Sequence, residues 1–494
     1  MDLFDTISPI DYRYYGDNPD FFERLQPYMS EKANIDYLLR VEVALTKMLE
    51  RWKICPEGIA DQVEEASRGI PATEVYEEER RVHHNIRALV NCIRKRISPE
   101  ARPFVHLFAT SADIMDSAAA LRYKELVRDV LLPDLIALES RLIILAKAYA
   151  EQPQIGRTHG QHAVPTTFGY AMALYVSRIG SRIQAIDRAH RNLRGKFSGA
   201  VGAFNALSLF YPDDPAVLEL ELLETLGLKP VEPSVSSQIV EPEPLTDLAY
   251  SVISCFSVLA NLADDMRNLI RNEIGEVVDK YKDEEVGSST MPHKMNPKNF
   301  ENVKSLWKEF MPRMTTVFMD QISEHQRDLT NSASGRFVPE LFTGFCYATM
   351  RMSEALAKIQ PNRRRMEENL ESSKQHVVAE PLYIILALNG HPDAYDTVMQ
   401  MSRESRRTGV TLIELAKQKR ELAPYLANLK PHLQEILDDP AKYIGAAPAR
   451  TSAVCDYWEP VCDTLRRQLE VERQDARRSA SAKLVRSSNN GHGY

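Results

Sequence analysis

Glycine is scarce in this sequence, and its cysteines form no recognisable framework. Only 20 of the 494 residues are glycine, whereas an average protein contains ~7% glycine, so the composition favours helices over turn-rich β structure. The six cysteines are scattered along the chain, without a Cys-x-x-Cys motif or a histidine at zinc-binding spacing. We therefore expect reduced, structural cysteines in a mainly helical protein.

The sequence also lacks an excess of positive charge and a long apolar segment. Its formal net charge is −8, so the field of the whole protein does not favour nucleic-acid binding. No run of eighteen apolar residues occurs, and the first residues are acidic and without the apolar core of a signal peptide. These absences predict a cytoplasmic protein that uses neither nucleic acid nor a membrane as a partner.

Long stretches with a helical spacing of apolar residues make up most of what is present. We predict an all-α fold of three helical domains, in which the central one is a long-helix bundle. The longest helix is expected to begin near Ser111, with at most a kink at Pro133. Residues 1–29 are expected to form an extended arm. The expected units are an N-terminal helical domain at 1–110, the central bundle at 111–364, a small helical domain at 365–464, and a charged, partly disordered tail at 465–494.

A polar loop, GSSTMPHKMNPKNFEN at residues 287–302, separates two of the predicted helices. Gly287 allows a bend that other residues resist, while Pro292 and Pro297 restrict the backbone and exclude helix. Ordered polar loops on a rigid helical scaffold often carry function. We therefore take this loop as the first candidate for the functional site.

The loop contains residue types that suit proton abstraction. A serine hydroxyl removes a carbon-bound proton only as an alkoxide, which a nearby cation and donated hydrogen bonds must stabilise. Lys294 and the amides of the Gly-Ser-Ser turn supply such groups. The alternative interpretation is structural, with Ser288 or Ser289 capping a helix and Lys294 in solvent.

A second polar segment, QPQIGRTHGQHAVPTTFG at residues 152–169, contains two histidines three residues apart. Its glycines and proline argue against regular structure, so we expect another irregular loop. His159 and His162 are possible metal ligands, but no third ligand follows at a suitable spacing. An imidazole is instead the natural proton donor to a leaving nitrogen or oxygen.

The loop matches GSSxMPxKxNP, the signature of the fumarase/aspartase superfamily of fumarate-eliminating enzymes. Over residues 8–450 the chain resembles the adenylosuccinate lyases, the purine-pathway family within that superfamily. GRTHGQHAVPTTFG and the signature loop are the most specific motifs, and SPIDYRY, HLFATSAD, SSQ and QRDLTNSASGR support them. The resemblance implies elimination of fumarate from adenylosuccinate and from the succinyl-carboxamide ribotide of purine synthesis.

The resemblance also implies roles for individual residues. His159 corresponds to the general acid, Ser289 to the general base with Ser288 as the fallback, and His84 to a histidine that assists the acid. Lys294 and Asn296 correspond to groups that bind the succinyl carboxylates, and Glu301 to an acidic partner of the acid histidine. The expected substrate contacts are Arg13, Tyr14, His83, Asn85, Thr110, Ser111, Thr158, Gln238, Ser288, Asn296, Arg327, Ser332 and Arg336.

The family resemblance further implies a homotetramer with active sites shared between subunits, nucleotide substrates, and no metal or cofactor. Two departures from the family pattern are visible: the helper histidine stands in His83-His84-Asn85, and Gln238 is followed by the proline-rich, acidic VEPEPLTD. Two alternatives stay open. One is another lyase of the superfamily, acting on argininosuccinate or a carboxymuconate, and the other is a non-catalytic helical scaffold.

Overall fold

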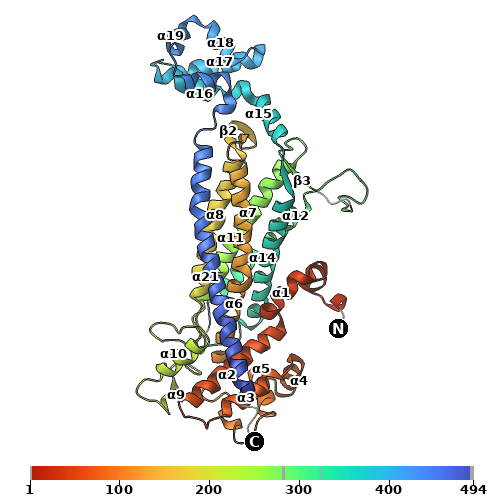
Figure 1. The fold of residues 1–494 in the computed structure, drawn as a ribbon, viewed down its shortest axis with the longest axis vertical. Coiled ribbons are helices and arrows are strands. Elements are labelled where there is room, and N and C mark those ends of the chain that lie inside the picture. The colour runs from red at the N-terminus through yellow and green to blue at the C-terminus, as the bar shows by residue number, and fades with distance from the viewer. Residues whose placement is uncertain (1–2, 281–283, 324, 490–494) are drawn as a thin grey trace.

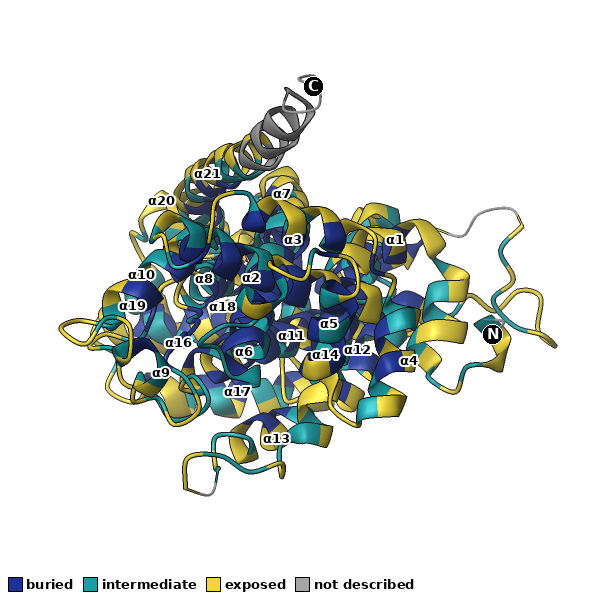
Figure 2. Ribbon diagram, turned by 90° about the horizontal axis from the view of Figure 1, so that it is seen from below, coloured by how far each residue is buried: buried dark blue, intermediate teal, exposed yellow. Residues whose placement is uncertain are grey.

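The fold is an elongated bundle of long helices with smaller helical units at its two ends (Figure 1). The computed structural model describes residues 3–280, 284–323 and 325–489. The all-α prediction is confirmed, since the strands in this part of the chain form two short antiparallel pairs, β1 with β2 and β3 with β4. Viewed along the bundle, buried residues occupy the inward faces of the helices and exposed residues the outside (Figure 2).

The central bundle is built from the longest helices, which place their apolar faces in one continuous core. Its elements are α6 (Ser111–Leu126), η4 (Val127–Leu131), α7 (Leu132–Ala148), α8 (Phe168–Arg191), α11 (Glu243–Ile270), α12 (Lys298–Phe310), α14 (Ser332–Lys358) and α21 (Ala447–Asn489). Of these, α11 is long and apolar enough to cross a membrane by length and composition. However, 67% of its apolar window is buried inside the molecule, so it serves as a core helix.

Helices α6 and α7 form one nearly continuous rod, as predicted. Thr110 and Asp113 form a capping box that begins α6. Pro133 lies in the first turn of α7, where its missing N–H is tolerated. The π-helical turn η4 directly before it accommodates the break in the regular α-helical hydrogen bonds. At ~1.5 Å per residue, the rod from Ser111 to Ala148 is roughly 55 Å long. The two ends of this rod therefore belong to opposite ends of the molecule.

The expected extended arm at residues 1–29 is wrong, because this segment is mostly helical. Phe21, Phe22 and Leu25 on α1 are buried, and the Phe22 ring lies 5.8 Å from the ring of Tyr347 on α14. Apolar packing therefore outweighs the prolines that suggested an arm. The elements at this end are η1 (Leu3–Asp5), η2 (Ile10–Tyr15), α1 (Pro19–Met29), α2 (Glu31–Arg51), α3 (Ile59–Arg68), α4 (Ala72–Val82), α5 (Asn85–Arg94), η3 (Arg102–Phe104), α9 (Asn205–Ser208), α10 (Ala216–Thr225) and α13 (Arg313–Met319).

The apolar clusters of the described residues can be compared with the expected domain boundaries. Residues 1–110 do not have a core of their own, since one apolar cluster includes both α2 and the central helices. A separate core does exist between residues 378 and 437. The elements around it are α15 (Arg363–Val377), α16 (Ala379–Leu388), α17 (Ala394–Thr408), α18 (Leu412–Gln418), η5 (Arg420–Leu422), α19 (Ala423–Leu426), α20 (Pro431–Asp438) and η6 (Pro440–Lys442).

After this small unit the chain returns along the bundle as α21, which corrects the prediction for 465–494. Residues 465–489 are helical, whereas the last five residues of the predicted tail, 490–494, lie outside the described residues. Cys455, Trp458 and Leu469 of α21 are buried in the main core. At Gly180 on α8 an added Cβ atom would lie 2.4 Å from the Trp458 ring, so this glycine lets the two helices approach.

Glu139 on α7 is a buried carboxyl group, and within the described residues neither of its oxygens has a hydrogen-bond partner. Burial raises the pKa of Glu139 well above its usual value, because the apolar surroundings disfavour the ionised carboxylate. We expect Glu139→Met to increase the free energy of unfolding by about 1–3 kcal/mol, because an unpaired buried polar group is removed. Urea unfolding of the variant beside the wild type measures this difference.

The effect of Glu139→Met has a predicted pH dependence. A raised native pKa means that ionisation of Glu139 does not disfavour the folded state below the unfolded pKa. This destabilisation grows as the pH rises from the unfolded pKa towards the native pKa. The advantage of Glu139→Met over the wild type should therefore grow from pH 5 to pH 9. Glu139→Gln is the matched control, since it cannot ionise. A methionine variant that is less stable than the wild type throughout this range contradicts the expectation.

Candidate active site

A β-hairpin, which we call the acid hairpin, connects α7 and α8 at one end of the bundle (Figure 1). His159 lies in its turn. The hairpin consists of β1 (Pro153–Thr158) and β2 (Gln161–Thr167), with Thr158 paired to Gln161. His159 and Gly160 form its two-residue turn with φ values of 55° and 72°, which is the geometry of a type I′ turn. The expected irregular loop is therefore wrong, and Thr158, His159 and His162 are exposed near the tip.

The segment 284–297, which we call the base loop, follows β3 (Val277–Asp279) and precedes α12. An added Cβ atom at Gly287 would lie 2.1 Å from the backbone oxygen of Lys294, so only glycine permits the loop to close here. Asn296 Nδ2 donates a hydrogen bond of 2.7 Å to the Gly287 oxygen. The predicted loop is confirmed, and it projects from the side of the bundle (Figure 1).

The two serines of the base loop have different surroundings. Ser288 Oγ accepts a hydrogen bond of 3.1 Å from the Met291 N–H, which stabilises the local turn. Ser289 and Lys294 are exposed, as is Glu301 in the first turn of α12. Ser288 thus takes part in the loop's own structure, while the Ser289 side chain faces solvent.

A third group of predicted residues, which we call the helper cluster, lies at the opposite end of the bundle. It comprises His83, His84, Asn85, Thr110 and Ser111. His84 begins α5, and its Nδ1 atom accepts a hydrogen bond of 3.3 Å from the Arg87 N–H. That arrangement leaves the proton on Nε2, which lies 3.5 Å from Ser111 Oγ.

A buried ion pair supports the helper cluster. Asp113 and Lys196 are almost completely buried and contact each other through Oδ1 and Nζ. The same oxygen accepts the N–H of Ser198, and Oδ2 accepts the N–H of Thr110 at 2.8 Å. A buried carboxylate with this many donors holds its surroundings rigidly, so the first turn of α6 is well positioned.

A second pair, which was not predicted from the sequence, lies next to this cluster. His106 Nδ1 lies 2.7 Å from Oε1 of Glu42, which is fully buried. Burial lowers the pKa of His106, but the hydrogen bond and charge of Glu42 outweigh this effect and raise it. His106 has a φ of 65° four residues before Thr110, so the pair fixes an unusual backbone turn there.

Several predicted substrate contacts lie near the helper cluster. The Gln238 N–H donates to the Gln326 oxygen at 3.3 Å, and the Val240 N–H donates to Oδ2 of Asp116 on α6 at 2.8 Å. Burial raises the pKa of Asp116 to about 6, although the charges of Lys196 and Arg327 oppose this rise.

The remaining predicted contacts are Ser332 and Arg336, in the first turns of α14, and Arg13 and Tyr14, in η2.

The predicted site residues therefore fall into separate groups within one chain. Tyr14 packs against Tyr347 with ring centroids 5.0 Å apart, along the side of the bundle. The helper cluster lies at one end of the α6–α7 rod and the acid hairpin follows its other end, with roughly 55 Å of helix between them (Figure 1). His84 and His159 of the same chain do not meet. The expectation that they serve one substrate requires them to come from different chains.

Comparison with known proteins identifies the family. A profile described as lyase matches residues 13–309, and one described as the adenylosuccinate lyase C-terminal region matches residues 323–444. The chain is 34% identical to the adenylosuccinate lyase of Pyrococcus horikoshii over 460 residues, which cover 92% of this chain and 98% of that protein. The chain belongs to the adenylosuccinate lyase family.

Further matches agree with this assignment. The adenylosuccinate lyase of Pyrococcus abyssi is 33% identical to the chain over 460 residues, covering 92% of this chain and 98% of that protein. The crystal structure of 3-carboxy-cis,cis-muconate lactonizing enzyme from Pseudomonas putida has a TM-score of 0.76, with 23% identity over 90% of this chain and 97% of that one. At that identity the likeness shows the fold alone, so the adenylosuccinate lyase assignment rests on the sequence comparisons.

Proposed function

We propose that the chain eliminates fumarate from adenylosuccinate to give AMP, with Ser289 as the general base and His159 as the general acid. The same elimination from succinylaminoimidazole carboxamide ribotide gives AICAR, so both reactions belong to purine nucleotide biosynthesis. Membership of the adenylosuccinate lyase family supports these two substrates. The observation that supports the chemistry is the base loop, a closed turn that presents Ser289 and Lys294 together to solvent.

The reaction is a β-elimination without hydrolysis. Ser289, as the alkoxide, removes the proton from the carbon between the carboxylate and the carbon that bears nitrogen. The electron pair forms the carbon–carbon double bond as the carbon–nitrogen bond breaks, and His159 donates a proton to the departing nitrogen. Lys294 and Asn296 hold the carboxylate that takes up negative charge in the carbanion-like transition state. The four side chains thus supply the base, the acid and the groups that bind the carboxylate.

The assembly we propose is a homotetramer whose active sites combine residues from different chains. The separation of His84 from His159 within one chain supports a composite site, because a nucleotide is far shorter than the α6–α7 rod. Exposed apolar side chains on the bundle helices also favour subunit contacts. These are Ile144 on α7, Leu174 on α8, Tyr250 on α11 and Phe337 on α14.

The direct test is conversion of the proposed substrates by the purified protein. We expect loss of the adenylosuccinate absorbance with equal amounts of AMP and fumarate formed, and the corresponding products from the carboxamide substrate. Argininosuccinate and 3-carboxy-cis,cis-muconate serve as comparison substrates. Turnover of either of these without turnover of the nucleotides would overturn the proposal and favour another lyase of the superfamily.

A further inference from the structure

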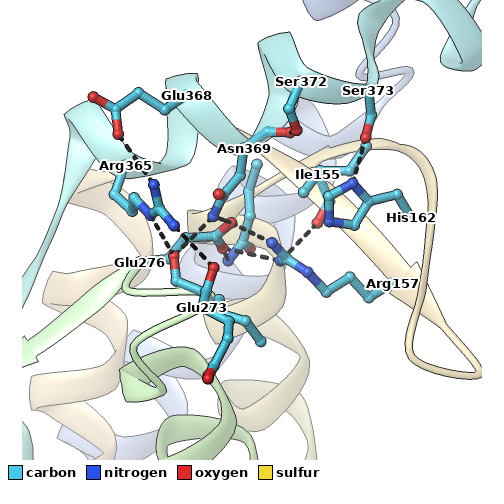
Figure 3. Close-up of polar contacts among 12 residues, drawn as sticks. Ile155, Arg157, His162, Glu273, Glu276, Arg365, Glu368, Asn369, Ser372 and Ser373 are labelled. Atoms are coloured by element: carbon cyan, nitrogen blue, oxygen red, sulfur yellow. Dashed lines mark hydrogen bonds and ion pairs between the residues drawn. The ribbon is translucent and has the colours of Figure 1, made fainter.

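Glu276 is a fully buried carboxylate that holds two distant segments of the chain together (Figure 3). It lies between α11 and β3. Its Oε2 atom accepts hydrogen bonds from Gln154 at 2.7 Å and from Arg157 Nη1 at 3.1 Å. Its Oε1 atom accepts from Arg157 Nη2 at 2.6 Å and from Asn369 Nδ2 at 2.8 Å. The carboxylate therefore has one forked arginine partner and two amide partners.

This arrangement requires several correctly placed hydrogen-bond partners. A buried carboxylate is tolerated only when it is paired and fully hydrogen-bonded, and a forked arginine contact also fixes the relative orientation of the two groups. The geometry of Glu276 thus depends on three elements at once, namely β1, the segment before β3, and α15. A displacement of any of them leaves a buried charge without its partner.

On one side, the network fixes the acid hairpin. Arg157 stands in β1 two residues before His159, and its Nη1 atom also donates to the Ile155 oxygen at 3.3 Å. On the opposite strand, His162 pairs with Arg157 in the β-register, and its Nδ1 atom contacts Ser373 Oγ on α15. The hairpin is therefore attached to α15 and to Glu276 close to its tip.

On the other side, the network fixes the segment that leads into the base loop. Glu276 immediately precedes β3, and its backbone oxygen accepts the Asn362 N–H at 2.8 Å. Arg365 on α15 donates to the backbone oxygens of Glu273 at 2.9 Å and Ile274 at 3.0 Å. β3 pairs with β4 (Ile359–Pro361), and the base loop follows β3 along the chain.

We propose that Glu276 is a positioning residue for the elimination, acting through Arg157 on His159 and through β3 on the base loop. This inference rests on the proposed function, since it assumes that His159 and the base loop carry the reaction. Glu276 does not touch the substrate. It holds, in one rigid network, the positions at which the acid hairpin and the base loop leave the bundle, and an error of about 1 Å in such positions can cost 10²-fold in rate.

The test compares catalysis with nucleotide binding. We expect Glu276→Gln to lower kcat for adenylosuccinate by roughly 10²-fold, since it removes the charge that orients Arg157. AMP has no succinyl group, so its Kd should stay within about 3-fold of the wild-type value, measured by calorimetry on the same preparation. The matched control is Glu371→Gln, which neutralises an exposed partner of Lys374 on the same helix α15 and should leave kcat unchanged.

Three further variants keep the test decisive if Glu276→Gln does not fold. Glu276→Asp keeps the charge but shortens the reach to Arg157, and Arg157→Lys keeps the charge but loses the fork. Arg157→Lys should retain about 10-fold more activity than Arg157→Met. A wild type that does not convert adenylosuccinate overturns the proposed function itself. With an active wild type, the positioning role is overturned if kcat is unchanged in the variants, or if AMP binding is lost in step with kcat.

Discussion

Ser289→Ala is expected to lower kcat for adenylosuccinate by roughly 10³-fold, because general acid–base catalysis by one positioned group typically contributes 10²–10⁴-fold. The hydroxyl is the only group lost, and Ser289 is exposed on the base loop, so the fold should not change. Steady-state rates with adenylosuccinate, together with thermal unfolding of the same sample, separate a catalytic loss from misfolding.

Ser288→Ala is the matched control for this prediction. Ser288 Oγ accepts the N–H of Met291, so its removal should loosen the turn and lower kcat by about 10-fold or less. A larger loss in Ser288→Ala than in Ser289→Ala would exchange the two roles and make Ser288 the base. Equal and small losses in both variants would contradict a serine base in this loop.

The second large effect is recovery of activity when two inactive variants are mixed. His84→Asn keeps a capping side chain at the start of α5, and His159→Ala removes the proposed acid. Each homotetramer should be deficient. If the helper cluster and the acid hairpin of one site come from different chains, random hybrids should regain about a quarter of wild-type activity, since both groups are intact in one site of four. The measurement is turnover after subunit exchange.

A control pair makes the interpretation specific. His84→Asn and Ser111→Ala both lie in the helper cluster, with Ser111 Oγ 3.5 Å from His84 Nε2. Hybrids of these two variants never contain an intact helper cluster, so mixing should not restore activity. Recovery in this control, or no recovery for the first pair in hybrids verified by mass, would contradict a site shared between chains.

The helical fold and the base loop could be predicted from the sequence because both depend on local signals. Apolar periodicity defines the long helices, and Gly287 with two prolines defines the loop. The acid hairpin was not predicted, since its turn uses His159 in the left-handed region, where Asn or Asp is the usual signal. The missed α1 helix also contains misleading prolines, at its first position and in its interior.

Other features of the site depend on contacts between distant residues. Glu276 meets Arg157 and Asn369, which stand 119 and 93 positions away, so no spacing rule connects them. The same is true of Asp113 with Lys196 and of Glu42 with His106. The last part of α21 was misjudged for a related reason. Its composition is polar, but Leu465 and Leu469 bury one face against the bundle.

The position of α21 also determines how late in translation the core around α7 and α8 can be completed. Cys455, Trp458 and Cys462 fill the core next to α7 and α8, yet they are translated about 300 residues after those helices. The earlier helices therefore leave the ribosome with an open apolar face, which α21 covers later. We infer that a chain truncated before α21 aggregates rather than forming a shorter folded bundle.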